Sequence, residues 1–166
     1  KTWVDDIRTW PSPDLTDDGI NLLSATLNEV AKKNRVGIPS GAETHVRMPR
    51  NDLIRLTQNV NLSHDYEIVK KLRMIKSKEE IIKIEKACTI AEEAFGRVPE
   101  IASENIRLDE VFRRFQVLCL EAGADWVPYL AGGADTEGYD DVISPAKESP
   151  LKRGDLLMLD TGLVWD

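Results

Sequence analysis

The residue of this sequence with the clearest chemical potential is Asp160, a lone carboxylate in the apolar segment 156–164. The apolar run before it, 156–159, is too short for a buried helix and follows Gly154, so we predict a buried strand that carries Asp160 towards the interior. A buried carboxylate is costly to desolvate unless it accepts hydrogen bonds or faces a cation. Two interpretations stay open: a strand end where Asp160 accepts hydrogen bonds from Thr161 and Gly162, which is the commoner arrangement, or a metal ligand.

Two segments together resemble the pita-bread metallohydrolase family, which includes creatinase, methionine aminopeptidase and Xaa-Pro dipeptidase. Residues 151–155, Leu-Lys-Arg-Gly-Asp, are followed by an apolar strand and then by Asp160-Thr161-Gly162, which is similar to the segment that supplies the first metal ligand in that family. Residues 72–81 precede an amphipathic helix and resemble the opening of the catalytic domain in the prolidase and creatinase branch. Each segment is moderately specific, and their order and separation strengthen the resemblance.

The resemblance implies an α/β (α+β) fold in two parts. Residues 1–70 correspond to the C-terminal part of a creatinase/prolidase-like N-terminal domain. Residues 71–166 correspond to the first half of a pita-bread catalytic domain, which would be truncated. Members of the family hydrolyse peptide or amide bonds with water activated by two divalent metal ions (Mn, Co, Zn or Fe), which two Asp, one His and two Glu residues hold.

Only the first of those ligands carries over to this sequence, and it is Asp160. The second Asp would lie just beyond Asp166, and the His and both Glu later still. We therefore expect the 166-residue chain to be inactive alone, although a full-length parent would be a metallopeptidase-like hydrolase. Relatives are commonly homodimers, so the resemblance implies a homodimer for that parent.

A second departure from the family concerns a substrate-side histidine, whose position falls at about Val142. Asp141 lies near enough in sequence to replace that proton donor, but no catalytic residue is assigned. The two histidines, His45 and His64, belong to the amino-terminal part, where we expect surface or loop positions. The missing histidine keeps two alternatives open: a creatinase-like hydrolase of a small non-peptide C–N bond, and a catalytically dead pita-bread module that binds a partner.

An aromatic segment offers candidate substrate-binding residues. Residues 126–134 place Trp126 and Tyr129 beside small residues, a composition typical of either a substrate groove or a close strand crossing. The sequence does not choose between these two. We interpret the two aromatic residues as partly buried wall residues of a pocket for a small peptide or amide substrate.

The apolar spacing predicts the elements that must position these residues. In the first part we expect a helix beginning near Ile20 and ending near Asn34, strands at 36–39 and 60–62, and a helix starting after Pro49. Ser77 and Glu80 form a capping box that starts a helix beside Lys78. Two apolar stripes at helical spacing should cover one face of a sheet; they comprise Ile81, Ile84, Cys88, Ala91, Phe95 and Val98, and then Leu108, Val111, Phe112, Phe115, Leu118, Cys119 and Ala122, closed by Gly123.

The charge distribution limits the classes of partner. The net charge is −7, and residues 1–70 contribute −1 while 71–166 contribute −6, so neither nucleic acid nor anionic lipid is an expected partner. No apolar stretch approaches the roughly 20 residues that cross a bilayer, so we expect no membrane association. Cys88 and Cys119 lack a paired spacing, which predicts a cytoplasmic protein with two buried thiols. An acidic loop interpreted as a solvated turn, or as a source of local cation affinity, holds Asp135, Glu137, Asp140 and Asp141.

Overall fold

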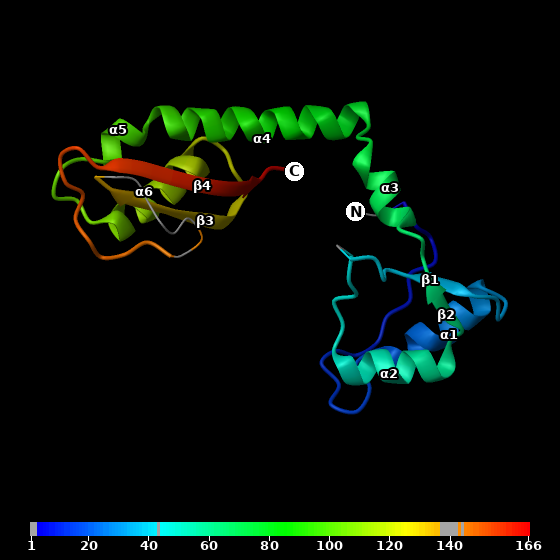
Figure 1. The fold of residues 1–166 in the computed structure, drawn as a ribbon. Coiled ribbons are helices and arrows are strands. Elements are labelled where there is room, and N and C mark those ends of the chain that lie inside the picture. The colour runs from blue at the N-terminus through cyan, green and yellow to red at the C-terminus, as the bar shows by residue number, and fades with distance from the viewer. Residues whose placement is uncertain (1–2, 43, 137–142, 144) are drawn as a thin grey trace. The chain divides into compact units, whose positions relative to one another are not determined.

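The structure is a computed structural model, and it describes residues 3–42, 44–136, 143 and 145–166. The chain divides into two compact units, a first unit Lys1–Ile75 and a second unit Lys76–Asp166 (Figure 1). The expectations for residues 137–142, which include Glu137, Asp140, Asp141 and Val142, lie outside the described residues.

The first unit contains a short parallel pair of strands with helices. Its elements are α1 (Ile20–Val30), β1 (Val36–Ile38), α2 (Arg50–Asn59), β2 (Leu62–His64) and α3 (Ile68–Met74). Strands β1 and β2 are parallel, with Val36 opposite Leu62. The predicted strands and the predicted helix starts of this part are confirmed within two residues. Helix α1 ends at Val30 and not near Asn34, and the short helix α3 was not predicted.

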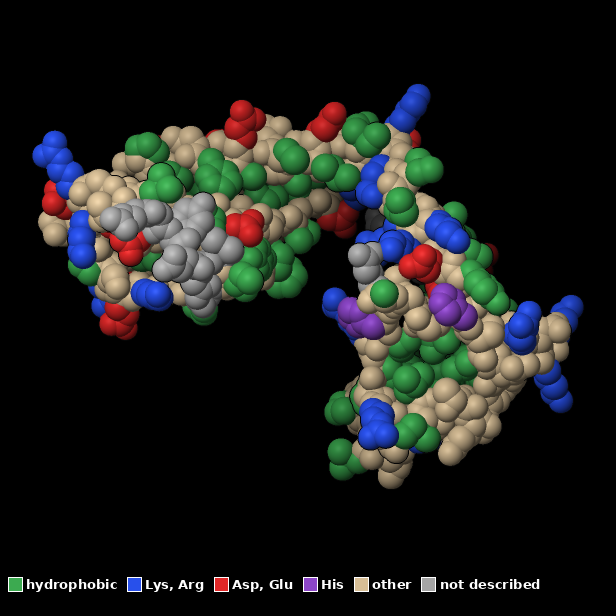
Figure 2. All heavy atoms as spheres, in the orientation of Figure 1, with side chains coloured by type: hydrophobic (Ala, Val, Ile, Leu, Met, Phe, Trp, Pro, Cys, Tyr) green, Lys and Arg blue, Asp and Glu red, His purple; other side chains and the backbone are tan. Residues whose placement is uncertain are grey.

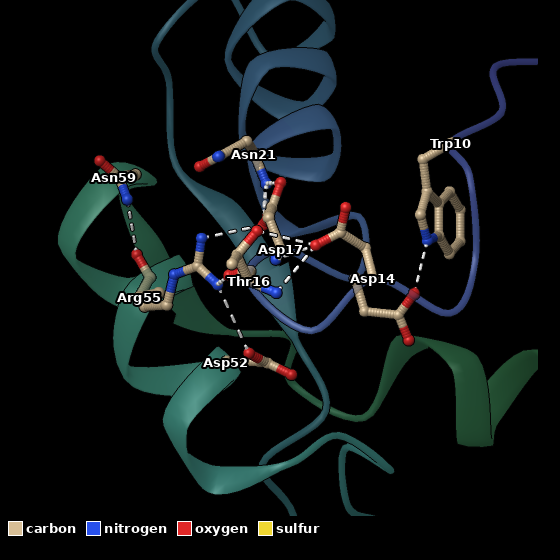
Figure 3. A network of polar contacts seen from close by, with 9 residues as sticks. Trp10, Asp14, Thr16, Asp17, Asn21, Asp52, Arg55 and Asn59 are labelled. Carbon is tan, nitrogen blue, oxygen red and sulfur yellow. Dashed lines mark hydrogen bonds and ion pairs between the residues drawn. The ribbon is translucent and has the colours of Figure 1, made fainter.

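A polar network fixes the segment before α1 (Figure 3). Asp17 accepts hydrogen bonds from the backbone N–H of Asn21 in the first turn of α1 and pairs with the Arg55 guanidinium of α2 at 2.8 Å. Asp14 accepts from the backbone N–H groups of Thr16 and Asp17, and these bonds lower the pKa of the Asp14 carboxyl. The acidic residues of this segment therefore hold a loop and two helices together.

The second unit combines three helices with a two-stranded antiparallel ribbon. Its elements are α4 (Lys78–Gly96), α5 (Val98–Ile101), α6 (Leu108–Glu121), β3 (Trp126–Asp135) and β4 (Leu156–Val164). The predicted capping box is confirmed: the Ser77 hydroxyl accepts from the Glu80 N–H, and the Glu80 carboxylate accepts from the Ser77 N–H at 2.7 Å. Because these bonds satisfy free amides of the first turn, α4 begins at Lys78 as predicted.

Helix α6 forms the centre of the core in this unit. It packs against β3 and α4, and Figure 1 shows it crossing one face of the ribbon. Gly123 ends the helix with a φ of 106°, as its predicted cap role requires. Every residue of the predicted stripe that lies within α6 is buried, which confirms that stripe: Leu108, Val111, Phe112, Phe115, Leu118 and Cys119.

The packing predicted for α4 is wrong. Its buried residues are Ile90 and Ala94, not the predicted face, and the amino-terminal half of the helix is exposed, with Ile81 at 45% and Cys88 also exposed. Figure 2 shows hydrophobic side chains open to solvent along this helix. Apolar spacing defines a face on a helix, but it does not show whether another element packs against that face. Among the described residues, the ribbon and α6 cover only the carboxyl-terminal half of α4.

Candidate functional site

The three residues singled out from the sequence lie on one ribbon. Asp160 of β4 is opposite Ala131 of β3, Tyr129 is opposite Gly162, and Trp126 is opposite Val164, with a register shift between Trp126 and Tyr129. Residues directly opposite in an antiparallel pair point to the same face, and so do residues two apart on one strand. Trp126, Tyr129 and Asp160 therefore share one face of the ribbon, which we call the outer face.

The other face of the ribbon holds the core. Leu159 of β4 and Leu130 of β3 are among the side chains that pack against the cluster around α6, together with Val127, Ala134, Leu157 and Leu163. Asp160 directly follows the core-facing Leu159 along the strand, so its side chain lies on the outer face, where it is exposed. The expectation that the strand carries Asp160 into the interior is wrong. A continuous apolar run suggested burial on both faces, whereas the helices cover one face only.

The strand-end interpretation of Asp160 is also wrong. Strand β4 continues to Val164, so Asp160 lies within the strand and not at its end. The Thr161 hydroxyl donates to the main-chain oxygen of Tyr129 at 3.1 Å and is not bonded to Asp160. Among the described residues, the Tyr129 hydroxyl donates to Oδ2 of Asp160 at 3.3 Å.

The surroundings of Tyr129 raise the pKa of its phenol. Partial burial raises the pKa of Tyr129, and the negative charge of Asp160 and the hydrogen bond between them raise it further. Tyr129 therefore stays protonated at neutral pH and keeps donating to Asp160. The bond restrains Oδ2 of the carboxylate, and no hydrogen bond to Oδ1 is found among the described residues.

The described residues do not complete a metal site. Within them, no group of three or more His, Cys, Asp or Glu side chains is arranged to hold a metal ion. Asp160 is thus a single candidate ligand, and useful affinity for a divalent ion needs several such groups. His45 and His64 are exposed residues of the first unit, which confirms their predicted surface positions.

The outer face offers aromatic area beside the carboxylate. The side chain of Trp126 is 62% exposed and that of Tyr129 is 44% exposed, more than the partly buried wall that the sequence suggested. An aromatic face next to an acidic group can contact an apolar or planar substrate group and hydrogen-bond a polar one. The pairing of Tyr129 with Asp160 was not foreseen, because a long connection between strands leaves their register unspecified.

Comparisons with known proteins agree with this architecture. No family model matches the chain. The Xaa-Pro dipeptidase of Pyrococcus furiosus is 32% identical over 110 residues, which cover 60% of this chain and 29% of that protein. Among solved structures, an X-Pro aminopeptidase from Thermotoga maritima aligns with a TM-score of 0.73 at 21% identity, covering 90% of this chain and 41% of the other. The prolidase of Pyrococcus horikoshii aligns with a TM-score of 0.72 at 23% identity, covering 90% and 41%.

These matches establish the fold and a similarity in sequence. The fold is similar to that of prolidase-type structures, and the chain spans less than half of each match. In sequence the chain is similar to two curated Xaa-Pro dipeptidases, and it spans less than a third of the length of each. Within the described residues, no helix is long and apolar enough to cross a membrane.

Proposed function

We propose that this chain is part of a metal-dependent hydrolase similar to Xaa-Pro dipeptidases, which cleaves a peptide bond with a metal-activated water. The observation that carries the proposal is the 32% identity to a curated Xaa-Pro dipeptidase over 110 residues. The relatives found do not favour the creatinase-like alternative or the binding-module alternative, so neither is put forward. The chain spans 29% of that relative, so we propose the activity for a parent protein that contains this chain.

The proposed role of Asp160 is to supply one carboxylate ligand to two divalent ions, Mn, Co, Zn or Fe. Its exposed position and its hydrogen bond from Tyr129 support this role, because metal-binding carboxylates are commonly oriented by a second hydrogen bond. Such ions, when bound, lower the pKa of a bound water and polarise the scissile carbonyl. Asp160 is the one ligand proposed among the described residues, and the other ligands are proposed to come from the rest of the parent protein.

Trp126 and Tyr129 are the proposed substrate-binding residues. Both lie on the face that carries Asp160, where an exposed indole can pack against a prolyl ring or another apolar substrate group. The net charge of −7 and the relatives fit a small peptide substrate better than an anionic polymer. A homodimeric, cytoplasmic enzyme remains part of the proposal.

The test starts by reading the coding sequence beyond Asp166. We expect a Gly-Tyr-x-x-Asp-like continuation after this residue, with a later His and two Glu, and their absence would remove the metal site. The longer protein should hydrolyse Xaa-Pro dipeptides with Mn²⁺ and lose activity on chelation, while the 166-residue chain should be inactive.

A matched pair of variants tests whether Asp160 is a metal ligand. In the longer protein, Asp160→Asn should lower kcat by about a hundredfold or more and weaken Mn²⁺ binding measured by calorimetry, because a ligand charge is lost. Glu104→Gln removes an exposed charge of the same unit and should change neither. Equal activity in the two variants would exclude Asp160 as a ligand. Turnover of small amidines or ureido compounds, but not of dipeptides, would indicate the creatinase-like reaction instead.

A further inference from the structure

We propose that His64 is a pH switch for the turn of residues 65–67, which connects β2 to α3. In the neutral state, Nδ1 of the imidazole ring accepts a hydrogen bond from the Tyr66 N–H at 2.7 Å. The side chain of His64 is 45% exposed, so its protonation follows the pH of the solvent. This inference concerns the first unit alone, and it does not depend on the proposed hydrolase.

The turn has a backbone conformation that needs such hydrogen bonds. Tyr66 has a φ of 53° and Glu67 has a φ of 60°. Left-handed backbone is unfavourable for residues other than glycine, and here two such residues follow one another. The N–H of each is held by the side chain two residues earlier, since the Glu67 N–H donates to Oδ1 of Asp65 at 3.0 Å. Loss of the bond between Tyr66 and His64 therefore removes one of these two restraints.

Protonation of His64 places two donors against each other. Nδ1 of an imidazolium carries a hydrogen and cannot accept, so at 2.7 Å it would face the Tyr66 N–H donor to donor. Oδ1 of Asp65 lies 3.6 Å from the same Nδ1, and a carboxylate oxygen can accept a second donor beside the Glu67 N–H. A charge-assisted hydrogen bond is stronger than a neutral one. The imidazolium therefore exchanges Tyr66 for Asp65 as its partner.

Asp65 is the fixed partner in this exchange. Its N–H donates to the main-chain oxygen of Ile38 on β1 at 3.3 Å, and a Cβ at Gly37 would lie 3.2 Å from Cα of Asp65. The side chain of Asp65 is 6% exposed, and its Oδ2 is buried without a hydrogen-bond partner among the described residues. Because Asp65 is held against β1, the imidazole ring and the backbone of Tyr66 must move instead.

Charged groups of several elements surround His64. The charged or titratable side chains that line a cavity together with it are Lys33, Arg35, His45, Asp65 and Tyr66. The carboxylate favours the imidazolium, whereas the basic side chains oppose it. From α3, the Lys71 ammonium donates to the main-chain oxygen of Tyr66 at 2.9 Å, and Lys70 pairs with Glu67 at 3.4 Å. The carboxylate of Asp65 is thus the group that draws the protonated ring away from Tyr66.

Release of the Tyr66 N–H weakens the start of α3. Glu67 is the N-cap of this helix, and its main-chain oxygen accepts a hydrogen bond from the Lys71 N–H at 2.9 Å. Helix α3 is the last element of the first unit along the chain, so the turn precedes the segment that leads into the second unit. Protonation of His64 therefore loosens the attachment of α3 to β2.

The test is NMR spectroscopy of the ¹⁵N-labelled 166-residue chain between about pH 8 and about pH 5, an interval in which imidazoles titrate. We expect the Tyr66 amide proton to shift upfield with the same midpoint as the His64 ring nitrogens, because both report the same hydrogen bond. Protection of the Lys71 amide from hydrogen exchange, corrected for the intrinsic effect of pH, should fall about fivefold. Titration of the His64 ring without a change at the Tyr66 amide, or unchanged protection of Lys71, would overturn the proposal.

Two variants of His64 separate the acceptor from the titration. His64→Asn keeps a side-chain oxygen that can accept from the N–H two residues later but does not titrate, so the Tyr66 amide should keep its high-pH position throughout. His64→Ala removes the acceptor, so the Tyr66 amide should stand at its low-pH position at every pH. His45→Asn replaces the other exposed histidine and should leave the transition at Tyr66 in place. A transition that persists in a folded His64→Asn variant would exclude His64 as the switch.

Discussion

Gly132 of β3 lies directly against the main-chain carbonyl of Met158 on β4. A Cβ at position 132 would stand 2.1 Å from that oxygen and 3.1 Å from the ring of Phe112, and the φ of Gly132 is 153°. Both facts exclude a side chain at this position, because no L-residue fits the contact or favours the backbone conformation. The close approach fixes the ribbon against α6, and the ribbon carries Asp160 and Tyr129.

Gly132→Ala should therefore destabilise the second unit by about 2–4 kcal/mol, because the strands must separate to admit the methyl group. Urea unfolding followed by tryptophan fluorescence measures this loss. Gly96→Ala is the matched control, since nothing lies within 4 Å of a Cβ at the end of α4, and it should be neutral or slightly stabilising. Equal stabilities of the two variants would contradict the contact.

The contact between Tyr129 and Asp160 predicts that replacing Asp160 changes the pKa of Tyr129. Burial raises the pKa of Tyr129 first, and the Asp160 carboxylate raises it further, so Asp160→Asn should lower that pKa towards the ordinary value without fully restoring it. Spectrophotometric titration at alkaline pH, taken as a difference between variant and parent, measures the shift. Glu104→Gln should give no difference. A flat difference curve for Asp160→Asn would show that the two residues do not interact in solution.

The segment before α1 predicts an acid limit to stability. Hydrogen bonds from the Trp10 indole at 2.8 Å and from the Ser12 hydroxyl at 2.9 Å lower the pKa of Asp18. A folded-state pKa below the unfolded value stabilises the fold above the unfolded pKa, and this stabilisation is lost as pH falls through the folded value, so below about pH 4. Thermal unfolding between about pH 2.5 and pH 6 should show the first unit weakening over that window.

Replacing Trp10, whose indole donates to Asp18, tests whether this hydrogen bond causes the pH dependence of stability. Trp10→Phe should reduce the pH dependence, although the contribution of Asp14 should persist because its carboxyl accepts backbone hydrogen bonds. Trp3→Phe removes an indole that is 92% exposed and should leave the profile unchanged. Identical profiles for Trp10→Phe and the parent would rule out the indole as the cause.

The two cysteines should differ sharply in reactivity. Cys88 is exposed on α4, whereas Cys119 is fully buried in α6, and burial raises the pKa of the Cys119 thiol. A thiol reagent should modify Cys88 rapidly at about pH 8 and Cys119 only after unfolding. Peptide mass spectrometry assigns each phase, and Cys88→Ser should abolish the fast one. Rapid labelling of Cys119 in the folded chain would contradict the core described for α6.

Local chemistry made several elements predictable from the sequence. The Ser77 capping box fixes the start of α4 through its own hydrogen bonds, and the stripe of α6 is buried on the side that its spacing indicates. Packing partners were not predictable. Cys88 was expected to be buried, and it is exposed because none of the described residues covers that part of α4.

The candidate site could also be predicted only in part, because its geometry depends on packing partners. Asp160 was correctly placed in a strand, but its face depends on which side α6 covers, and its pairing with Tyr129 depends on a register that no short turn sets.

The alternation of β4 constrains how such a chain can vary in length. Insertion or deletion of a single residue between Leu157 and Asp160 would reverse the parity of the strand, turning the carboxylate towards α6 and core leucines towards water. A change of two residues would preserve parity but would move Asp160 away from Tyr129. Tolerated length changes should therefore fall in the connection between β3 and β4, and relatives that keep this ribbon should align through Asp160 without gaps.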